Sequence, residues 1–300
     1  MNALYERSLA RLRAAALFAA DKPDETPEST ARALWLAAAG APQAVTRSTG
    51  GLPELSPPQS DRFEALLDRR VAGEPLAYLL GRQEFMGHEF LTAPGALIPR
   101  RETELLGRAA AGLAREWAAV RGSVRVLDLC TGSGNLAVSL ALEEPRSLVW
   151  ASDLEAEAVA LAARNVTFHG VGDRVTLLTG DLFGAVDQAA PPPAPFDLIV
   201  CNPPYIPTHK ARSIPVEVGG FEPTAAFDGG DFGLSILFRL IADAPRYLVA
   251  GGWLCFELGA GQGRLIEKRL SGHGGYSEIR TVADHAGTVR AVMARTGGAH

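Results

Sequence analysis

Short apolar runs alternate with helix-like segments from about residue 122 onward, and this alternation limits the possible folds more than any other feature of the chain. The strand-like runs are Val124–Leu129, Leu148–Ser152, Val175–Leu178, Phe196–Cys201 and Trp253–Leu258. Helix-like segments lie between them at Leu136–Leu142, Ala156–Asn165 and Gly233–Leu248. Strands that alternate with helices predict a parallel sheet with helices on both faces.

The end of the chain departs from this pattern. Two further strand-like runs, Ser277–Ala283 and Thr288–Ala294, are separated only by the turn at Asp284–Gly287. A parallel crossover needs a dozen or more residues, so these two strands must be antiparallel. A mostly parallel, seven-stranded α/β sheet closed by a late antiparallel hairpin is the layout typical of class I methyltransferases.

The residues before about position 80 predict a separate helical part. Thr26-Pro27-Glu28 is a helix start, with a capping hydroxyl and a proline in the first turn, and it leads into Ala31–Ala39. A break rich in Gly, Pro and Ser follows at Ser48–Ser60, and a second helix is predicted to open at Ser60-Asp61. A short hairpin is predicted over Glu84–Leu91. We therefore predict a helical domain at residues 1–80, a hairpin linker at 81–100 and the α/β domain at 101–300.

Composition argues against several classes of protein. The net charge of −5 disfavours a broad phosphate-binding surface, so stable binding to nucleic acid is not expected. Cys130, Cys201 and Cys255 show no CxxC spacing, and the histidines show no ligand spacing, so neither a metal site nor a disulfide framework is predicted. No apolar run reaches the roughly 20 residues that cross a membrane. We expect a monomeric, cytoplasmic protein that does not bind membranes.

The most informative motif is Asn202-Pro203-Pro204-Tyr205, which follows the strand-like run Phe196–Cys201. The side-chain oxygen of Asn202 and the carbonyl of Pro203, whose conformation Pro204 restricts, can together accept both hydrogens of one planar NH₂ group. Tyr205 can lie flat against the plane that carries this group. The motif predicts a site that alkylates an amide or an aromatic amine on nitrogen. Asn202, Pro203 and Tyr205 are the predicted catalytic residues, and all four residues are predicted to bind the acceptor.

An amide nitrogen is a poor nucleophile because its lone pair is delocalised into the carbonyl. Accepting both N–H hydrogens pushes electron density back onto nitrogen, and in-line positioning can supply several kcal/mol, up to roughly 7–11 in ideal cases. The excess proton becomes strongly acidic only after transfer. No general base is therefore expected.

A second motif, Asp128–Gly134, follows the first strand and opens a helix. Its glycines let the backbone turn tightly and leave room for a ligand at the helix N-terminus. Asp153 ends the next strand nineteen positions after Gly134, where a doubly wound fold places a carboxylate for ribose hydroxyls. Taken alone, this pattern also fits dinucleotide dehydrogenases.

Two details favour S-adenosylmethionine over NAD. Asp128 would repel a pyrophosphate but not a zwitterionic amino acid with a cationic sulfonium, and the spacing of the turn is not GxGxxG. After the third strand, Asp181 can hydrogen-bond the adenine amine and Leu182 can flank the ring. The predicted cofactor-binding residues are Asp128, Cys130, Thr131, Gly132, Ser133, Gly134, Asp153, Asp181, Leu182 and Asn202.

With these motifs the chain resembles the HemK/PrmC protein-(glutamine-N5) methyltransferases, which modify peptide chain release factors. The resemblance extends from about Gly73 to Arg295. Besides the motifs above, it rests on Gly73–Tyr78, Leu97–Arg100 with Thr103-Glu104, Phe221–Pro223, and Asp284, Gly287 and Arg290.

The resemblance implies a Rossmann-like, S-adenosylmethionine-dependent methyltransferase domain and an N-terminal helical domain that helps to hold the protein substrate. It implies methyl transfer to the N5 amide of a glutamine, in the Gly-Gly-Gln motif of release factors. The chain departs from the family at Cys130, where glycine is usual, and at Arg101 and Glu102, which replace Pro-Asp. Its first 70 residues match only in helical character.

Other functions remain open at this point. A close relative of the family methylates a glutamine of a ribosomal protein. Adenine also offers a planar NH₂ group, so methyltransferases that act on the exocyclic amine of adenine in nucleic acid use the same tetrapeptide, but they should carry a basic, aromatic-rich surface. A non-catalytic cofactor-binding protein would not need to keep both Asn202 and Asp153.

Overall fold

The computed structural model describes residues 3–15, 17, 22–191, 193, 195–211 and 216–297. Its contacts divide the chain into two compact units. The helical unit comprises Met1–Pro94 together with Ile214–Glu222. The sheet unit comprises Gly95–Ser213 and Pro223–His300. One short segment from the second half of the chain therefore belongs to the helical unit.

The helical unit packs around aromatic side chains. Trp35 makes edge-to-face contacts with Tyr5 and Phe63, at ring-centroid distances of 5.8 and 5.0 Å, and each such pair adds to the stability that burial alone provides. A two-stranded antiparallel hairpin follows the helices, as predicted. The elements are α1 (Ala3–Ala14), α2 (Pro27–Ala38), η1 (Val45–Arg47), α3 (Pro57–Val71), α4 (Leu76–Leu80), β1 (Arg82–Phe85), β2 (His88–Leu91) and α10 (Val216–Gly219).

The start of α2 is confirmed, whereas the predicted start of α3 is wrong. Thr26 caps α2 and Pro27 is its first residue. Helix α3 begins at Pro57, not at Ser60, because Ser56 and Gln59 cap each other's backbone N–H groups reciprocally. Prolines are tolerated in a first turn because those N–H groups have no partner inside the helix. The break that precedes α3 is correspondingly shorter than predicted.

A buried ion cluster links distant parts of the helical unit. The side chain of Arg70 on α3 is completely buried and pairs with Glu25 at 3.0 Å and with Glu217 of α10 at 3.1 Å. Lys22 also pairs with Glu217, at 2.7 Å. A buried guanidinium needs such partners because removing a charge from water is costly. This cluster holds α10 in the helical unit.

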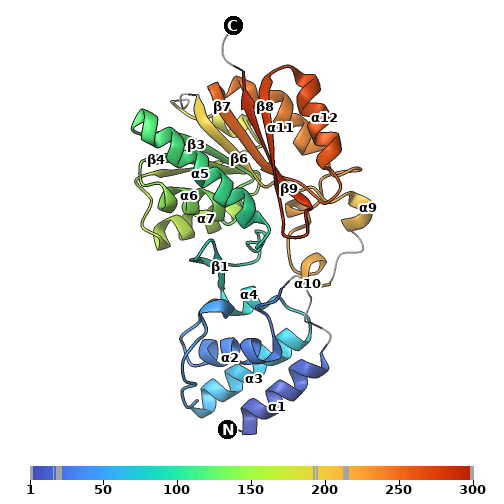
Figure 1. Ribbon diagram of the computed structural model, residues 1–300. Coiled ribbons are helices and arrows are strands. Elements are labelled where there is room, and N and C mark those ends of the chain that lie inside the picture. Colours follow the sequence, from blue (N-terminus) through green and yellow to red (C-terminus); the bar gives the residue numbers. More distant parts are fainter. Residues whose placement is uncertain are drawn as a thin grey trace. The chain divides into compact units, whose positions relative to one another are not determined.

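The sheet unit contains the predicted mixed sheet of seven strands (Figure 1). Their order is β5-β4-β3-β6-β7-β9-β8, parallel from β5 to β7 and antiparallel at β9 and β8. This is the fold of class I methyltransferases. The strands are β3 (Val124–Leu129), β4 (Ser147–Asp153), β5 (Val175–Thr179), β6 (Phe196–Cys201), β7 (Leu248–Glu257), β8 (Tyr276–Ala283) and β9 (Val289–Thr296).

Helices cover both faces of this sheet. In Figure 1, α5, α6 and α7 gather on one side of the strands and α11 and α12 on the other. The longer helices are α5 (Thr103–Arg121), α6 (Asn135–Glu143), α7 (Ala156–Phe168), α11 (Ser235–Asp243) and α12 (Gly263–His273). The short ones are α8 (Gly184–Asp187), α9 (Thr208–Ala211), η2 (Thr224–Ala226) and η3 (Ala244–Arg246).

Two helices differ from the sequence prediction. The helix predicted to reach Leu248 ends at Asp243, because Pro245 lacks an N–H group and the chain closes in the short turn η3. Leu248 instead pairs with Phe196 at the start of β7. Helix α5 was not predicted, although its buried Leu106, Ala110, Leu113 and Ala114 recur at helical spacing.

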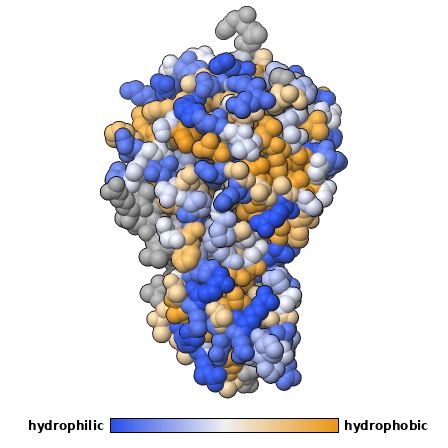
Figure 2. Space-filling model, turned by 180° about the vertical axis from the view of Figure 1, so that it is seen from behind, coloured by the Kyte–Doolittle hydropathy of each residue, from blue (hydrophilic) through white to orange (hydrophobic). Residues whose placement is uncertain are grey.

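Both units show hydrophilic and hydrophobic residues at their surface, and Figure 2 shows them interspersed on one side. Such mixing is normal for a folded chain. Over the part of the chain that the structure describes, no helix is both long and apolar enough to span a membrane.

Candidate active site

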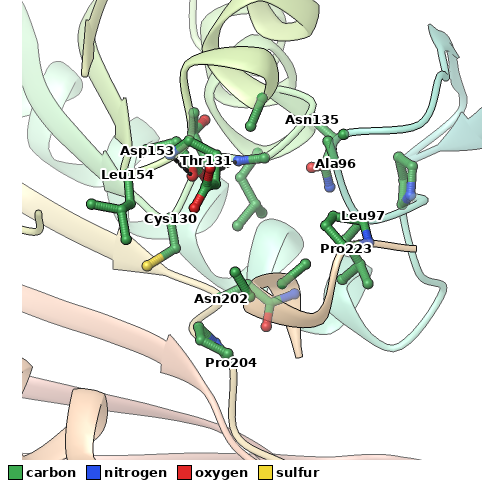
Figure 3. Close-up of a pocket in the computed structure, with 18 of the residues that line it drawn as sticks. Ala96, Leu97, Cys130, Thr131, Asn135, Asp153, Leu154, Asn202, Pro204 and Pro223 are labelled. Carbon is green, nitrogen blue, oxygen red and sulfur yellow. Dashed lines mark hydrogen bonds between the residues drawn. The ribbon is translucent and has the colours of Figure 1, made fainter. Parts of the chain in front are cut away.

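A pocket lies at the carboxyl ends of the parallel strands β3, β4, β5 and β6 (Figure 3). Ligands of open α/β sheets bind at this edge. The pocket holds about 970 Å³ of empty space, counting the part open to solvent. Its lining includes Ala96, Leu97, Pro99, Arg100, Thr103, Cys130, Thr131, Gly132, Asn135, Asp153, Leu154, Asp181, Leu182, Asn202, Pro204, Pro223 and Ile236.

Asp128 lies beneath the turn that follows β3 and is completely buried. Its Oδ2 atom accepts hydrogen bonds from the Thr131 hydroxyl at 2.6 Å and from the Ala137 backbone N–H at 3.1 Å. Burial raises the pKa of Asp128 to about 7, against the opposing effect of these hydrogen bonds. The structure thus places Asp128 where it braces the turn from below, and it does not line the pocket.

The backbone at this edge is strained at two non-glycine residues. Cys130 has φ 56° and Leu182 has φ 47°, in the left-handed region that favours glycine. Both residues line the pocket. Strain of this kind tends to collect at functional sites, where the surrounding structure holds it in place. The backbone at Cys130 does accommodate a side chain, although the resembled family usually has glycine at this position.

Gly134 forms the N-cap of α6 with φ 78°. A Cβ atom added there would lie 3.0 Å from the Cβ atom of Ala162 on α7. Glycine therefore allows the close approach of α7 to the turn. The neighbouring Ser133 is buried and its hydroxyl donates to Asn135. Neither Gly134 nor Ser133 lines the pocket, in contrast to Cys130, Thr131 and Gly132.

Asp153, at the end of β4, lies beside the turn and lines the pocket with it (Figure 3). Its two carboxyl oxygens accept the backbone N–H groups of Gly132 at 2.8 Å and of Glu155 at 3.1 Å. Burial raises its pKa, and these hydrogen bonds oppose that rise. A carboxylate has about four acceptor positions, so it can still receive hydroxyl groups. Beside it, Leu154 is 60% exposed at the pocket.

Asp181, after β5, is paired with a cation. Arg239 of α11 contacts its carboxylate at 2.6 Å, and both side chains are about half exposed. Leu182, the next residue, is buried and lines the pocket. The structure thus places one apolar side chain and one carboxylate where the sequence predicts an adenine site, but with the carboxylate already in an ion pair.

The Asn-Pro-Pro-Tyr motif follows β6 directly, and Asn202 and Pro204 line the pocket. The Asn202 amide nitrogen donates to the hydroxyl oxygen of Thr103 at 3.0 Å. Pro203 is buried and is not part of the lining. Tyr205 also lies outside the lining, and its hydroxyl donates to Glu257 Oε1 at 2.9 Å.

Glu257, at the end of β7, is only 2% exposed. Desolvation raises its pKa to about 7, whereas hydrogen bonds from Thr103 and Tyr205 lower it. Glu102 raises this pKa further and Arg290 lowers it. Burial and the nearby Glu257 carboxylate in turn raise the pKa of Tyr205, which is therefore a neutral hydroxyl donor.

The motif's backbone rests against a glycine-containing segment. A Cβ atom at Gly229 would lie 2.6 Å from the Pro204 carbonyl oxygen, and one at Gly233 would lie 2.1 Å from that of Tyr205. The Gln262 side chain also donates to the Tyr205 carbonyl, at 3.1 Å. These contacts hold the loop that carries the motif.

Several pocket residues were not assigned a role from sequence. The segment Leu97–Arg100 and Pro223 entered only as family motifs, yet they form one wall of the pocket (Figure 3). Thr103 was likewise only part of a motif. Glu257 was missed altogether, although an acidic residue at the end of an apolar strand is a signal that would have found it.

The pocket residues fit S-adenosylmethionine. Asp153 keeps free acceptor positions for ribose hydroxyls, and Leu154, Leu182 and Ile236 supply apolar surface for a purine. The turn and the N-terminus of α6 lie next to them and suit the amino-acid end of the cofactor. Among the described residues, no cluster of His, Cys, Asp or Glu has the makings of a metal site.

Comparisons with known proteins agree with both units. The model of the PrmC N-terminal domain matches residues 10–81, and that of the methyltransferase small domain matches residues 110–217. A release factor glutamine methyltransferase from Geobacter sulfurreducens is 41% identical over 243 residues, which cover 81% of this chain and 81% of that protein.

A second relative with the same name, from Xylella fastidiosa, is 38% identical over 269 residues, which cover 89% of this chain and 93% of its own. Among solved structures, a methyltransferase from Pyrococcus furiosus aligns with a TM-score of 0.50 and 19% identity, over 77% of this chain and 97% of that one. At such low identity this structural likeness concerns the fold alone.

Proposed function

The chain belongs to the release factor glutamine methyltransferase family, and from this premise we propose that it methylates a protein glutamine. The donor is S-adenosylmethionine, and the acceptor is the N5 amide nitrogen of the glutamine in the Gly-Gly-Gln motif of a peptide chain release factor. One observation carries this proposal. Asn202, which suits an NH₂ group, lines the same pocket as Asp153 and the turn at Cys130–Gly132, which suit the cofactor.

The cofactor supplies a methyl group already activated on a sulfonium, so the protein's task is alignment and electrostatics. Asn202 Oδ1 and the Pro203 carbonyl would accept the two hydrogens of the glutamine amide. These two contacts would direct the nitrogen lone pair of the amide toward the activated methyl group that the cofactor would supply. The excess proton then leaves to solvent. Tyr205 would support the plane of the amide.

We assign the cofactor contacts to the residues predicted from sequence, except for three that do not line the pocket. Asp153 would hold the ribose hydroxyls, Leu182 would flank the adenine, and the backbone of Cys130–Gly132 would meet the amino-acid end. Asp128, Ser133 and Gly134 would hold the turn in place without touching the cofactor. Asp181 would reach the adenine amine only with its carboxylate still paired to Arg239.

We also propose that the helical domain at residues 1–80 recognises the release factor and that residues 81–100 link it to the methyltransferase domain at 101–300. The match of residues 10–81 to the PrmC N-terminal domain supports this division. The protein would then act as a monomer in the cytoplasm, where release factors work, without bound nucleic acid.

The test is methyl transfer in vitro. The recombinant chain, deuterated S-adenosylmethionine and a release factor are incubated, and tryptic peptides are analysed by mass spectrometry. We expect one labelled methyl group on the glutamine of Gly-Gly-Gln, and none when that glutamine is replaced by glutamate. Label on a ribosomal protein or on adenine in an oligonucleotide, with none on the release factor, would overturn the proposed substrate.

Asn202→Ala gives a sharper test of the site. It should keep cofactor affinity, measured by calorimetry, because Asp153 and the turn remain intact. Transfer should fall by about 100-fold or more, as when one electrostatic contact to a reacting group is removed. Unchanged transfer would show that Asn202 does not hold the acceptor.

A further inference from the structure

The Asn202 carboxamide can serve as an acceptor only if its oxygen, and not its nitrogen, faces the substrate. The two ends of a carboxamide have nearly the same shape, so hydrogen bonds must set its direction. Its nitrogen donates to the Thr103 hydroxyl at 3.0 Å. Thr103 is 1% exposed, so water does not complete this contact. The group that sets the direction of the Thr103 hydroxyl therefore also sets the orientation of the Asn202 carboxamide.

A hydroxyl that accepts one hydrogen bond must place its own hydrogen on another acceptor. The Glu257 carboxyl fits that role, because hydrogen bonding from the Thr103 side chain is one of the effects that lower its pKa. The other donor is Tyr205, whose hydroxyl reaches Oε1 at 2.9 Å. Glu257 Oε2 is buried and has no hydrogen-bond partner among the described residues, so it is open to the Thr103 hydroxyl. Buried polar atoms of this kind rarely stay without a donor.

An ionised carboxylate can only accept hydrogen bonds. It therefore compels Thr103 to donate toward Glu257 and to accept from Asn202. The NH₂ group of Asn202 must then face Thr103, which leaves Oδ1 on the opposite side of the carboxamide. We propose that Thr103 and Glu257 are positioning residues that hold the Asn202 carboxamide in its acceptor orientation. This inference rests on the proposed function of Asn202.

Protonation of Glu257 would remove the constraint. A neutral carboxyl can donate its own hydrogen to the Thr103 oxygen, and the Thr103 hydrogen is then free to turn toward Asn202. The carboxamide would reverse and present NH₂ to the NH₂ of the substrate. The charged or titratable groups that face Glu257 are Glu102 ahead of α5, Tyr205 after β6 and Arg290 on β9. With its pKa raised to about 7, this carboxyl changes charge near neutral pH.

Two substitutions at Thr103 test this relay, in which Glu257 fixes the Thr103 hydroxyl and Thr103 fixes the Asn202 carboxamide. Thr103→Val keeps the shape and removes the hydroxyl, whereas Thr103→Ser keeps the hydroxyl. We expect Val to lower kcat about tenfold or more, in line with the loss of one buried hydrogen bond, with little change in the KM for S-adenosylmethionine. Ser should restore most of that loss. Equal kcat in the Val variant and the wild type, or equal losses in the two variants, would overturn the proposal.

The charge of Glu257 is tested by a pH profile. In the wild type, kcat should rise with pH through about 7, because only ionised Glu257 fixes the relay. Glu257→Gln should lower kcat at pH 8 and remove this rise. A variant that kept the same inflection would contradict the role of Glu257. Thermal melting of each variant shows whether it is folded at the assay temperature.

A readout independent of substrate separates this inference from the proposed function. The side-chain amide protons of Asn202 can be followed by ¹H–¹⁵N NMR of the free protein. We expect slow solvent exchange of one amide proton in the wild type and in Thr103→Ser, and fast exchange in Thr103→Val. This result would hold even if release factors proved to be the wrong substrate. Fast exchange in the wild type would overturn the relay whatever the substrate.

Discussion

At the scale of single residues, the acceptor motif depends on what lies behind it. Gly233 is buried at φ 68°, and a Cβ atom there would meet the Tyr205 carbonyl oxygen at 2.1 Å. A Cβ atom at Gly229 would lie 2.6 Å from the Pro204 carbonyl oxygen. Real side chains never approach a backbone atom this closely. Because these two glycines have no side chain, the backbone of the acceptor motif can pack directly against them.

We predict that Gly233→Ala disturbs the acceptor loop, with Gly261→Ala as its control. Gly261 also has a positive φ of 89°, but it is exposed and has nothing within 4 Å of an added Cβ atom. Both variants carry the left-handed strain of about 1–2 kcal/mol. Only Gly233→Ala adds overpacking, typically about 1–3 kcal/mol more. Urea unfolding measures both, and equal losses would mean that the contact at Tyr205 is relaxed without cost.

Sequence reasoning located the residues that carry recognisable chemistry and missed those that orient them. Asn202 and Asp153 stand at strand ends next to motifs, so their place in one pocket followed from the rule for parallel sheets. Thr103 and Glu257 are 154 positions apart in the chain and meet only through the sheet order. No local pattern connects a threonine at a helix start with a glutamate at a strand end.

At the scale of elements, the last turn of helix α3 carries two arginines, one buried and one exposed. Arg69 and Arg70 are neighbours in its last turn. Arg70 has a fully buried side chain that pairs with Glu25 and Glu217. Arg69 is 55% exposed and pairs with Glu74 at 2.6 Å. The same residue type at adjacent positions thus makes one buried and one surface ion pair.

We predict that Arg70→Leu destabilises the helical unit by about 3–5 kcal/mol, because it removes the fully buried cation from two largely buried carboxylates and leaves them only Lys22. Arg69→Leu should change the unfolding free energy by about 1 kcal/mol or less, as expected for a surface pair. Of the four tryptophans, Trp35 lies in the helical unit and can report its unfolding by fluorescence. Similar losses in the two variants would show that burial of Arg70 does not matter.

The strands were predicted better than the helices that connect them. A short apolar run ends where burial ends, so most strand bounds can be read from composition. The strand predicted from Trp253 is an exception, since β7 already begins at Leu248 and most of its residues before Trp253 are not fully buried. A helix end depends on caps and prolines, as at Ser56 for α3 and Pro245 after α11. Helix α5 was missed because it is rich in alanine, and alanine marks a buried face less clearly than larger side chains do.

At the scale of the whole molecule, the buried carboxyl groups of the site lower the stability of the fold at neutral pH. Asp128 and Glu257 are both buried, and their pKa values are raised to about 7. Asp153 is shifted in the same direction by burial. Each of these groups holds its proton more tightly in the folded state than in the unfolded chain. In the unfolded chain the same groups ionise near their ordinary values of about 4.

The sign of the effect follows from proton binding. Between about pH 4 and 7 the folded protein holds more protons than the unfolded chain, so its unfolding free energy falls as pH rises. This contribution to stability is fully present below the unfolded pKa values and is lost as pH passes through about 7. Glu144 and Asp284 have lowered pKa values and act in the opposite direction, but only below their ordinary range.

We therefore predict that the protein is more stable at pH 5.5 than at pH 8, by an amount on the order of several kcal/mol at most, since one pKa unit corresponds to about 1.4 kcal/mol. Methyl transfer should follow the reverse order, because it needs ionised Glu257. Urea unfolding and kcat measured at the same pH values check both trends. The double variant Asp128→Asn, Glu257→Gln should flatten the stability profile. Stability that rises from pH 5.5 to 8 in the wild type would mean that these carboxyls are ionised in the folded state, and the proposed link between folding and the acceptor site would fail.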